Sequence, residues 1–481
     1  MRHRRILRID VVSEMDFNVK KVIYALALAL IFLSSLVIQS YPSDSARISL
    51  EYVLSQRMSI RDWKNIPIDG EVIRSVCLNS FVSVFDLKGM ELYMSNSSGI
   101  YEFKKESNQF SLKSSEDVRY QLGSDVDQNF ISYAPCIITI VWNNEIEPNE
   151  LLAFRKAGII AQSLYILSIR FGLGGVSVGG AIYASDRTAR IQGHLGLPPN
   201  IKPAMLFPVG YLPEGQDYPS GLLQSTSGNL PTPIEFEVDV LDLYQRSAIW
   251  SESSSLSQQQ MSNLLWSMYG YSLLGTYHRT VPSSYGEYPF QIFVCNMTGV
   301  YNYTANLHSL HRTVYADRRS EVVRNTGGRQ YMENAPTLLV ICWNSQVGTH
   351  NASDTSSGGR FINVEIGCCL QNLYLSTTLL NMSTTPVVTT SNYESLRTDL
   401  SSPPLEDTIY PMYLVALGRK TILGDINGDY KVNIIDINLV AKAFQTGPGN
   451  TRWNSNVDLN GDRIINIMDI TLAARNFGQE I

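Results

Sequence analysis

The stretch AGIIAQSLYILS, residues 157–168, returns later in the chain as IGCCLQNLYLST, residues 366–377. In both stretches apolar residues recur at three- and four-residue spacing, which predicts an α-helix. Upstream of each helix lies a short apolar run, APCIITIVW at 134–142 and APTLLVICW at 335–343. Such runs predict buried strands. The same elements therefore occur twice, in the same order.

Two further pairs extend this duplication. GIYEFKKESNQFSL at 99–112 is echoed by GVYNYTANLHSL at 299–310, and LSQRMSIRDW at 54–63 by LYQRSAIWSE at 243–252. The offset grows by about a dozen residues between these pairs, at RTVPSSYGEYPFQIFV, residues 279–294, whose Pro-Ser-Ser turn has no counterpart in copy one. Two long copies favour an intrachain pseudo-dimer over a solenoid. We place copy one at about 47–225 and copy two at about 233–420, joined by the polar QSTSGNLPTP.

The composition is that of a globular protein. The chain has 481 residues, 44% of them hydrophobic, and a formal net charge of -6, so no basic patch indicates a nucleic-acid partner. Residues 22–38, VIYALALALIFLSSLVI, follow Lys20 and Lys21. Residues 1–40 are therefore a signal peptide or a membrane anchor, and the remainder is expected to be extracellular or at the cell surface. The six cysteines could form disulfides or be buried as small hydrophobes.

The C-terminal region contains two calcium-type loops, DINGDYKVNIID at 425–436 and DLNGDRIINIMD at 458–469, each followed by a helical run. Oxygen side chains at loop positions one, three, five, nine and twelve, with a backbone carbonyl at seven, can surround one hard cation. The predicted ligands of two Ca²⁺ ions are Asp425, Asn427, Asp429, the Lys431 carbonyl, Asn433 and Asp436, then Asp458, Asn460, Asp462, the Ile464 carbonyl, Asn466 and Asp469.

With Asp at position twelve and no helix before the loop, this pair resembles a type I dockerin, at about 422–481. The resemblance implies a small all-α domain with two EF-hand-like loops that docks onto a cohesin-like module of a partner. The residues after position nine are Ile434-Ile435 and Ile467-Met468, where the best-known dockerins have small polar residues. This difference favours either a hydrophobic docking face or a structural role within the protein.

The duplicated region resembles the nitroreductase-like flavoproteins, particularly the SagB-type dehydrogenases and their tandem relatives. The resemblance is carried by QRMSIRDWKNIPID at 56–69, AGIIAQSLYILSIRFGLGGVSVGG at 157–180, HLGLPPNIKPAMLFPVGY at 194–211 and the stretch LSQQQMSNLLW to GVYNY at 256–303. It implies an α+β fold of two paired halves with FMN at the interface between them. It also implies that Arg57, Ser59 and Arg61 hold the flavin phosphate and ribityl chain, that Gly179 and Gly180 lie against the ring, and that Pro282, Ser283 and Ser284 reach it from copy two.

The two prospective flavin sites are unequal. Copy two offers Gln245, Ser247 and Ile249 in place of the Arg-x-Ser-x-Arg segment, and its post-helix loop lacks the glycines, whereas copy one lacks the Pro-Ser-Ser turn. These losses are complementary and leave one complete site. Copy one also ends without the basic residues that the family often uses on the phosphate, whereas Arg419 and Lys420 end copy two.

Two functions follow from these observations. The first is an exported or surface FMN-dependent oxidoreductase that transfers hydride to and from the flavin and attaches to a partner through the dockerin; no catalytic residue or substrate is identified. The alternative is a non-catalytic surface binding or scaffold protein that retains the nitroreductase fold without FMN. Export favours this alternative, because secretion in the unfolded state strips cofactors.

Overall fold

The computed structural model describes residues 47–83, 85–179, 185–215, 228–236, 238–244, 256–272, 278–328, 330–347, 357–380, 382–388, 392–419, 424–427, 431–454, 457–459 and 464–479. Several predicted positions lie outside these ranges: the apolar run 22–38, Gly180, Asp429, Asn460, Asp462, Lys420 and the copy-two residues Gln245, Ser247 and Ile249.

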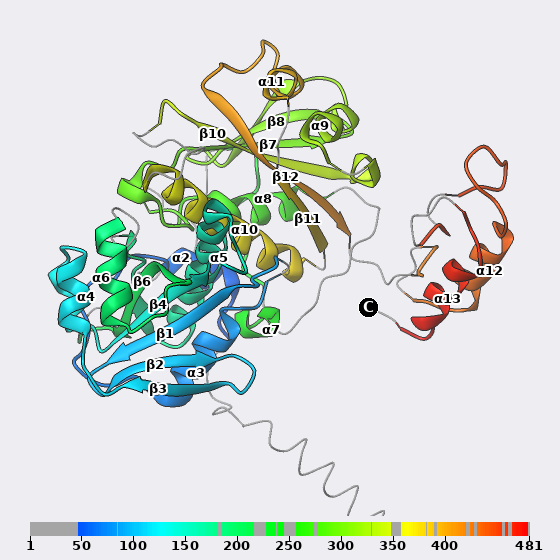
Figure 1. The fold of residues 1–481 in the computed structure, drawn as a ribbon. Helices are drawn as coiled ribbons and strands as arrows, with labels where there is room; N and C mark the ends of the chain where they lie inside the picture. Colours follow the sequence, from blue (N-terminus) through cyan, green and yellow to red (C-terminus); the bar gives the residue numbers. More distant parts are fainter. Residues whose placement is uncertain are drawn as a thin grey trace, which may run out of the picture. The chain divides into compact units, whose positions relative to one another are not determined.

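Two six-stranded antiparallel sheets with the same strand order form the frame of the fold (Figure 1). The first has the order β3-β2-β1-β4-β6-β5, and the second has the order β9-β8-β7-β10-β12-β11. The strands of the first sheet are β1 Met90–Asn96, β2 Gly99–Lys104, β3 Gln109–Ser114, β4 Cys136–Asn143, β5 Leu173–Gly175 and β6 Ile201–Tyr211. Those of the second sheet are β7 Phe290–Asn296, β8 Gly299–Thr304, β9 Ser309–Val314, β10 Thr337–Asn344, β11 Met382–Val388 and β12 Ile409–Arg419.

The helices repeat in the same way. Those of the first half are α2 Leu50–Gln56, α3 Gly70–Asn79, α4 Arg119–Asp125, α5 Glu150–Arg170 and α6 Ser185–His194, with the short turn η1 Asn129–Tyr133. Those of the second half are α7 Val240–Tyr244, α8 Gln258–Tyr269, α9 Arg319–Thr326, α10 Ser357–Leu379 and α11 Tyr393–Leu400, with η3 Ser284–Gly286 and η4 Gln330–Asn334. The connection before the first sheet runs from residue 80 to 89 and its counterpart from 270 to 289, so the extra residues of copy two lie between α8 and β7.

The two long helices α5 and α10 pack directly on each other, and Figure 1 shows them side by side in teal and yellow. A side chain at Gly158 would lie 2.0 Å from the carbonyl oxygen of Val364, and one at Gly367 would lie 2.1 Å from the carbonyl oxygen of Arg155. Gly158 and Gly367, and Arg155 and Val364, occupy equivalent positions of the two copies. Each half therefore makes the contact that the other half makes, as in an isologous dimer.

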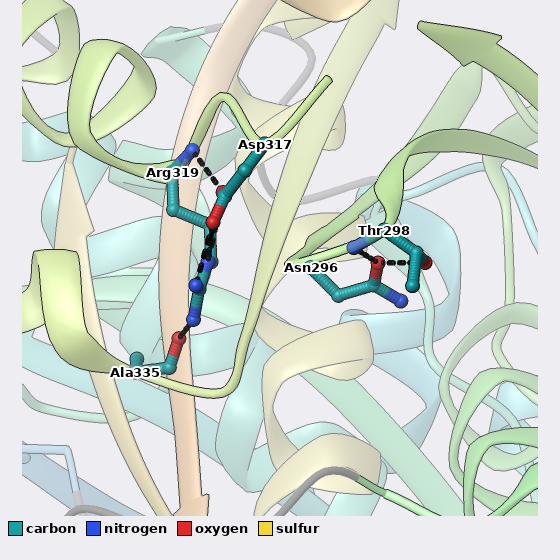
Figure 2. Close-up of polar contacts among 5 residues, drawn as sticks. All are labelled: Asn296, Thr298, Asp317, Arg319 and Ala335. Atoms are coloured by element: carbon teal, nitrogen blue, oxygen red, sulfur yellow. Dashed lines mark hydrogen bonds and ion pairs between the residues drawn. The ribbon is translucent and has the colours of Figure 1, made fainter. Parts of the chain in front are cut away.

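Small contacts outside the helix pair are duplicated too. Figure 2 shows Arg319 bound to Asp317 and donating to the carbonyl oxygen of Ala335, at 2.7 Å. The first half has the same arrangement, with Arg119 bound to Asp117 and donating at 2.9 Å to the Ala134 carbonyl. The figure also shows the side chain of Asn296 accepting from Thr298 in the β7–β8 turn. These contacts fix the same turns and helix starts in both halves.

One apolar core is shared by both halves and includes α5, α10 and the inner faces of both sheets. A smaller core lies on the other face of each sheet, under α4 and α6 in the first half and under α9 and α11 in the second. Helix α5 is apolar and long enough to cross a membrane, but 94% of its apolar window is buried inside the protein, as expected of a core helix. All six cysteines are buried free thiols in this core arrangement.

The C-terminal region is a separate pair of short helices, α12 Ile434–Lys442 and α13 Ile467–Arg475, with its own small core around Val440, Val457, Ile465 and Ala473. The two repeats join through a Thr446–Ile465 bridge. Both helices begin with the same capping box, formed by Asn433 and Asp436 in α12 and by Asn466 and Asp469 in α13. The loop sequence thus sets each helix start.

Candidate functional site

The interface between the halves holds a network of buried polar side chains. Gln162 of α5 donates through Nε2 to Asn372 Oδ1 at 2.8 Å and to the Thr280 carbonyl at 3.0 Å. The equivalent Gln371 of α10 donates at 3.0 Å to the carbonyl of Val82, in the matching connection of the first half. These hydrogen bonds from the two side-chain amides hold one half in register with the other.

Arg57 of the first half reaches into this interface. It follows the last residue of α2, is 4% exposed, and donates through Nε to the carbonyl oxygen of Arg279 at 2.7 Å. Its guanidinium lies 5.5 Å from the centre of the Tyr165 ring. Its Nη1 is buried and finds no acceptor among the described residues. A buried guanidinium N–H without an acceptor is costly, so this atom is poised for an anionic or carbonyl oxygen of a ligand.

A group of hydroxyls lies on the same side of α5. Tyr165 Oη accepts from the Ser177 backbone N–H at 2.8 Å and lies 3.2 Å from Ser177 Oγ. Ser59 Oγ lies 3.4 Å from the same tyrosine oxygen. Ser59 is thus brought close to the loop that follows α5. Arg61, in contrast, is exposed and its guanidinium lies 5.8 Å from the Phe130 ring centre, toward the surface of the first half.

Gly179 lies against the second half. A side chain at this position would meet Phe361 of α10 at 2.2 Å, so the absence of a Cβ is what lets the loop pack on α10. This contact supplies a structural reason for the glycine, beside the ring contact that the family resemblance implies.

The Pro-Ser-Ser turn is half-buried and leads into η3. Ser283 Oγ donates to Glu365 Oε2 of α10 at 2.5 Å and accepts from the Tyr288 N–H at 3.0 Å. The turn follows Arg279, whose carbonyl holds Arg57, so turn and arginine belong to one region of the interface. The hydroxyl of Ser283, however, is engaged with α10 rather than with Arg57.

Glu365 is a carboxyl group inside the interface, 4% exposed, and sequence analysis did not single it out. Its second oxygen accepts from Tyr269 Oη at 2.8 Å. Burial raises the pKa of Glu365 to about 7, while the hydrogen bonds from Ser283 and Tyr269 and the charge of Arg279 act to lower it. The signal in the sequence is one charged residue inside the apolar run FINVEIGCCL, residues 361–370.

The position equivalent to Glu365 in the first half is Lys156. Lys156 is also buried, but it forms an ion pair with Glu147 at 2.9 Å and donates to the Lys88 carbonyl at 3.0 Å. The first half therefore balances its buried charge within a pair, whereas the second half holds a carboxyl group that is neutral below about pH 7. The two interface regions differ chemically even where the backbone repeats.

Arg279 is surrounded by aromatic rings. Its guanidinium carbon lies 4.6 Å from the ring centres of Tyr269, Tyr271 and Tyr288. Such cation–π contacts stabilise a guanidinium that has little access to water. This arrangement holds the backbone of residues 279–280, which accepts from Arg57 and Gln162, in a fixed position.

The calcium-type loops are shaped by their position-twelve carboxylates, which are fully buried. Asp436 Oδ1 accepts from the Ile426 N–H at 2.8 Å, and Asp469 Oδ1 accepts from the Leu459 N–H at 2.8 Å. Of the predicted ligands, the described ones are Asp425, Asn427, Lys431, Asn433, Asp436, Asp458, Ile464, Asn466 and Asp469. The predicted ligand atoms are all oxygens, which suits Ca²⁺. The remaining predicted ligands, Asp429, Asn460 and Asp462, lie outside the described residues.

The fold and these sites define a tandem α+β protein whose halves pair like the subunits of a dimer, joined to a small two-loop helical module. The nitroreductase family model matches residues 54–211 and 251–419, and the dockerin type I domain model matches residues 423–477. The chain belongs to the nitroreductase family and carries a C-terminal dockerin domain, as the sequence predicted.

Two relatives illustrate the match. A protein assigned as a nitroreductase in Methanocaldococcus jannaschii is 28% identical over 198 residues, which are 40% of this chain and 95% of that protein. The crystal structure of a protein assigned as a nitroreductase from Anabaena variabilis covers 79% of this chain and 93% of its own, with a TM-score of 0.57 and 13% identity. The second match extends over both halves and supports the tandem fold.

A second crystal structure is that of a protein assigned as a nitroreductase from Desulfovibrio desulfuricans, in complex with FMN. It is 16% identical and covers 36% of this chain and 91% of its own, with a TM-score of 0.28.

Proposed function

We propose that the protein is an FMN-dependent oxidoreductase of the tandem, SagB-like type, with one flavin site between its halves, tethered to a partner through its dockerin. The observation that carries this proposal is Arg57, buried at the interface with Nη1 left without an acceptor among the described residues. A phosphate or ribityl oxygen would satisfy this N–H.

The residues of this chain would bind and orient the flavin. Arg57 and Ser59 would hold the phosphate and ribityl end, and Gln162 and Asn372 would keep the two halves in register around it. Bound FMN would supply hydride transfer to and from its ring. Arg61, Gly179, Gly180, Pro282, Ser283 and Ser284 remain predicted contacts of this site.

A flavin titration tests this function. The full-length protein, purified with calcium and stripped of any bound flavin, should quench FMN fluorescence with a stoichiometry of one FMN per chain. Bound FMN should then be reduced by a nicotinamide hydride donor under anaerobic conditions. A protein that leaves FMN fluorescence unchanged at millimolar flavin would refute the flavin site while leaving the dockerin function intact.

The second candidate is the scaffold protein without FMN. Two contacts favour it: Ser283 is engaged with Glu365, and Arg61 lies toward the surface. Neither side chain points a donor at the Arg57 region in the present arrangement. This candidate predicts no flavin binding together with calcium-dependent partner binding.

For the dockerin we propose two bound Ca²⁺ ions and a hydrophobic docking face for a cohesin-like module. The side chains that follow loop position nine are more than half exposed: Ile434, Ile435, Ile467 and Met468. Exposed apolar side chains gathered at two helix starts are typical of an interaction surface. Replacing Ile434 and Ile467 by Ser should abolish binding to a panel of cohesin modules without changing calcium affinity; unchanged binding would place the docking face elsewhere.

We further propose that the protein is exported. The apolar run 22–38 behind two lysines and the presence of a dockerin domain support this. Mass spectrometry of the protein made by a secreting host separates the two modes: a mature N-terminus near residue 40 indicates a signal peptide, and an intact N-terminus in the membrane fraction indicates an anchor. An intact chain in the cytosol contradicts export.

A further inference from the structure

A cavity of about 360 Å³ lies between the first half and the start of α10. Trp142 of β4 and Phe154 of α5, with ring centres 5.3 Å apart, supply aromatic lining. Lys202 of β6 and Arg360 of α10 supply positive charge, and Glu150 of α5 supplies one negative charge. The cavity is large enough for a small organic ligand.

The second half of the same chain indicates what the cavity can hold. In the first sheet Trp142 of β4 pairs in register with Lys202 of β6, and in the second sheet Trp343 of β10 pairs with Tyr410 of β12. Both strand pairs have a bulge one or two residues before the tryptophan. The two tryptophans and their partners are thus structurally equivalent.

Both tryptophans are nearly fully buried, 6% exposed for Trp142 and 5% for Trp343, but different side chains pack beside them. The rings of Trp343 and Tyr410 are stacked, with centres 5.1 Å apart and planes inclined by 28°. A guanidinium, that of Arg397, lies 5.3 Å from the Tyr410 ring centre. In the first half lysine replaces the tyrosine, and Trp142 lines a cavity. The second half thus already packs an aromatic ring, that of Tyr410, between a tryptophan and a cation.

The charge at the cavity favours an anion. Arg360 is paired with Glu150 at 2.6 Å, so these two charges compensate each other. Lys202 Nζ has a long 3.4 Å contact with Gln192 Oε1, and no carboxylate within the described ranges forms an ion pair with it. The half-buried ammonium group leaves the lining with a net positive charge, which a ligand carboxylate can pair with.

We propose that this cavity binds a planar aromatic carboxylate of one or two rings, with its ring against Trp142 and its carboxylate on Lys202. The proposal does not depend on flavin binding. Phe361, which packs on Gly179, follows the cavity residue Arg360 in α10.

Calorimetric titration of the full-length, calcium-loaded protein tests the proposal with three probes. 2-Naphthoate has both the ring and the charge, 2-naphthamide has the ring alone, and cyclohexanecarboxylate has the charge alone. We expect 2-naphthoate to bind at least about tenfold more tightly than either of the others, because each of the other probes lacks either the charge-assisted contact or the aromatic ring contact. Equal affinity for all three, or no binding of 2-naphthoate at 10 mM, would overturn the proposal.

Variants at one position separate the contributions. Lys202→Met should weaken 2-naphthoate binding about tenfold or more and leave 2-naphthamide unchanged, and Lys202→Arg should restore most of the affinity. Lys202→Tyr reproduces the second half, so its ring should stack on Trp142 and exclude the ligand. Lys105→Met is the matched control, because Lys105 also lies over an aromatic ring, that of Phe81 at 5.2 Å, but outside the cavity. Full binding by the folded Lys202→Tyr variant would place the ligand elsewhere.

Discussion

The buried carboxyl group of Glu365 should make the stability of the interface depend on pH. Its pKa is raised to about 7 in the folded protein, from an ordinary value of 4.5, mainly by burial. The folded state therefore keeps a proton between pH 4.5 and 7 that the unfolded state has lost. Unfolding releases this proton, so the free energy of unfolding falls as pH rises through this window and levels off above it.

The size of the effect follows from the two values. The difference between about 7 and 4.5, at 1.36 kcal/mol for each tenfold change in proton affinity, gives about 3 kcal/mol. Glu365→Gln replaces the carboxyl by a neutral group of the same shape that can still accept from Tyr269 and donate to Ser283. The variant should therefore lack this part of the pH dependence and be more stable than the wild type by about 3 kcal/mol at pH 8.

The assay is denaturant unfolding of both proteins in saturating calcium at pH 4.5, 5.5, 6.5, 7.5 and 8. The difference between the wild-type and variant stabilities isolates Glu365, because other titrating groups, such as Glu51 with its pKa also raised to about 7, are common to both. Ser283→Ala removes a hydrogen bond that lowers the Glu365 pKa, so its stability should keep falling to higher pH. Parallel stability curves for wild type and Glu365→Gln would refute the assignment of a neutral buried carboxyl.

Three further changes test other parts of the structure. Gly158→Ala should destabilise the protein by about 1–3 kcal/mol in thermal unfolding, because its Cβ would meet the Val364 carbonyl. The control Gly193→Ala, with open space around it in α6, should be neutral or stabilising by up to about 1 kcal/mol. Equal effects of the two substitutions would exclude the close crossing of α5 and α10. Arg57→Met should weaken FMN binding at least about tenfold in the fluorescence titration, and unchanged affinity would remove Arg57 from the site. Asp436→Asn should weaken one of two calcium-binding events about tenfold by calorimetry, and a melting curve insensitive to excess chelator would contradict calcium binding altogether.

Much of the fold could be predicted because the same pattern of helices and strands occurs twice in the sequence. The predicted helices at 157–168 and 366–377 lie within α5 and α10, and the predicted strands lie within β4 and β10. The growth in offset located the longer connection before β7. Local periodicity carries this information, since helix and strand faces repeat every few residues.

The geometry of the site needed the structure, because it depends on which side chain of one half meets which backbone of the other. The family resemblance implied that Arg57 and Arg61 act together, but Arg57 follows α2 directly and is turned inward, and the residues after it are irregular, so Arg61 is exposed. Glu365 could be noticed as a charge in an apolar helix, yet its partners Tyr269 and Ser283 are about a hundred residues away. No periodicity reports contacts of that range.

The differences between the halves are more informative than the duplication itself. Where two copies of a fold have diverged, equivalent positions with different side chains point to a change in use: Tyr410 stacks on Trp343, whereas its counterpart Lys202 lines a cavity together with Trp142. Likewise Lys156 is neutralised by Glu147, whereas its counterpart Glu365 stands with hydroxyl partners beside the Pro-Ser-Ser turn. If the two halves only had to pack in the same way, neither of these two side-chain differences would be needed. Both differences, together with the buried Arg57, lie where the two halves meet, which is where the flavin site and the second ligand site are proposed.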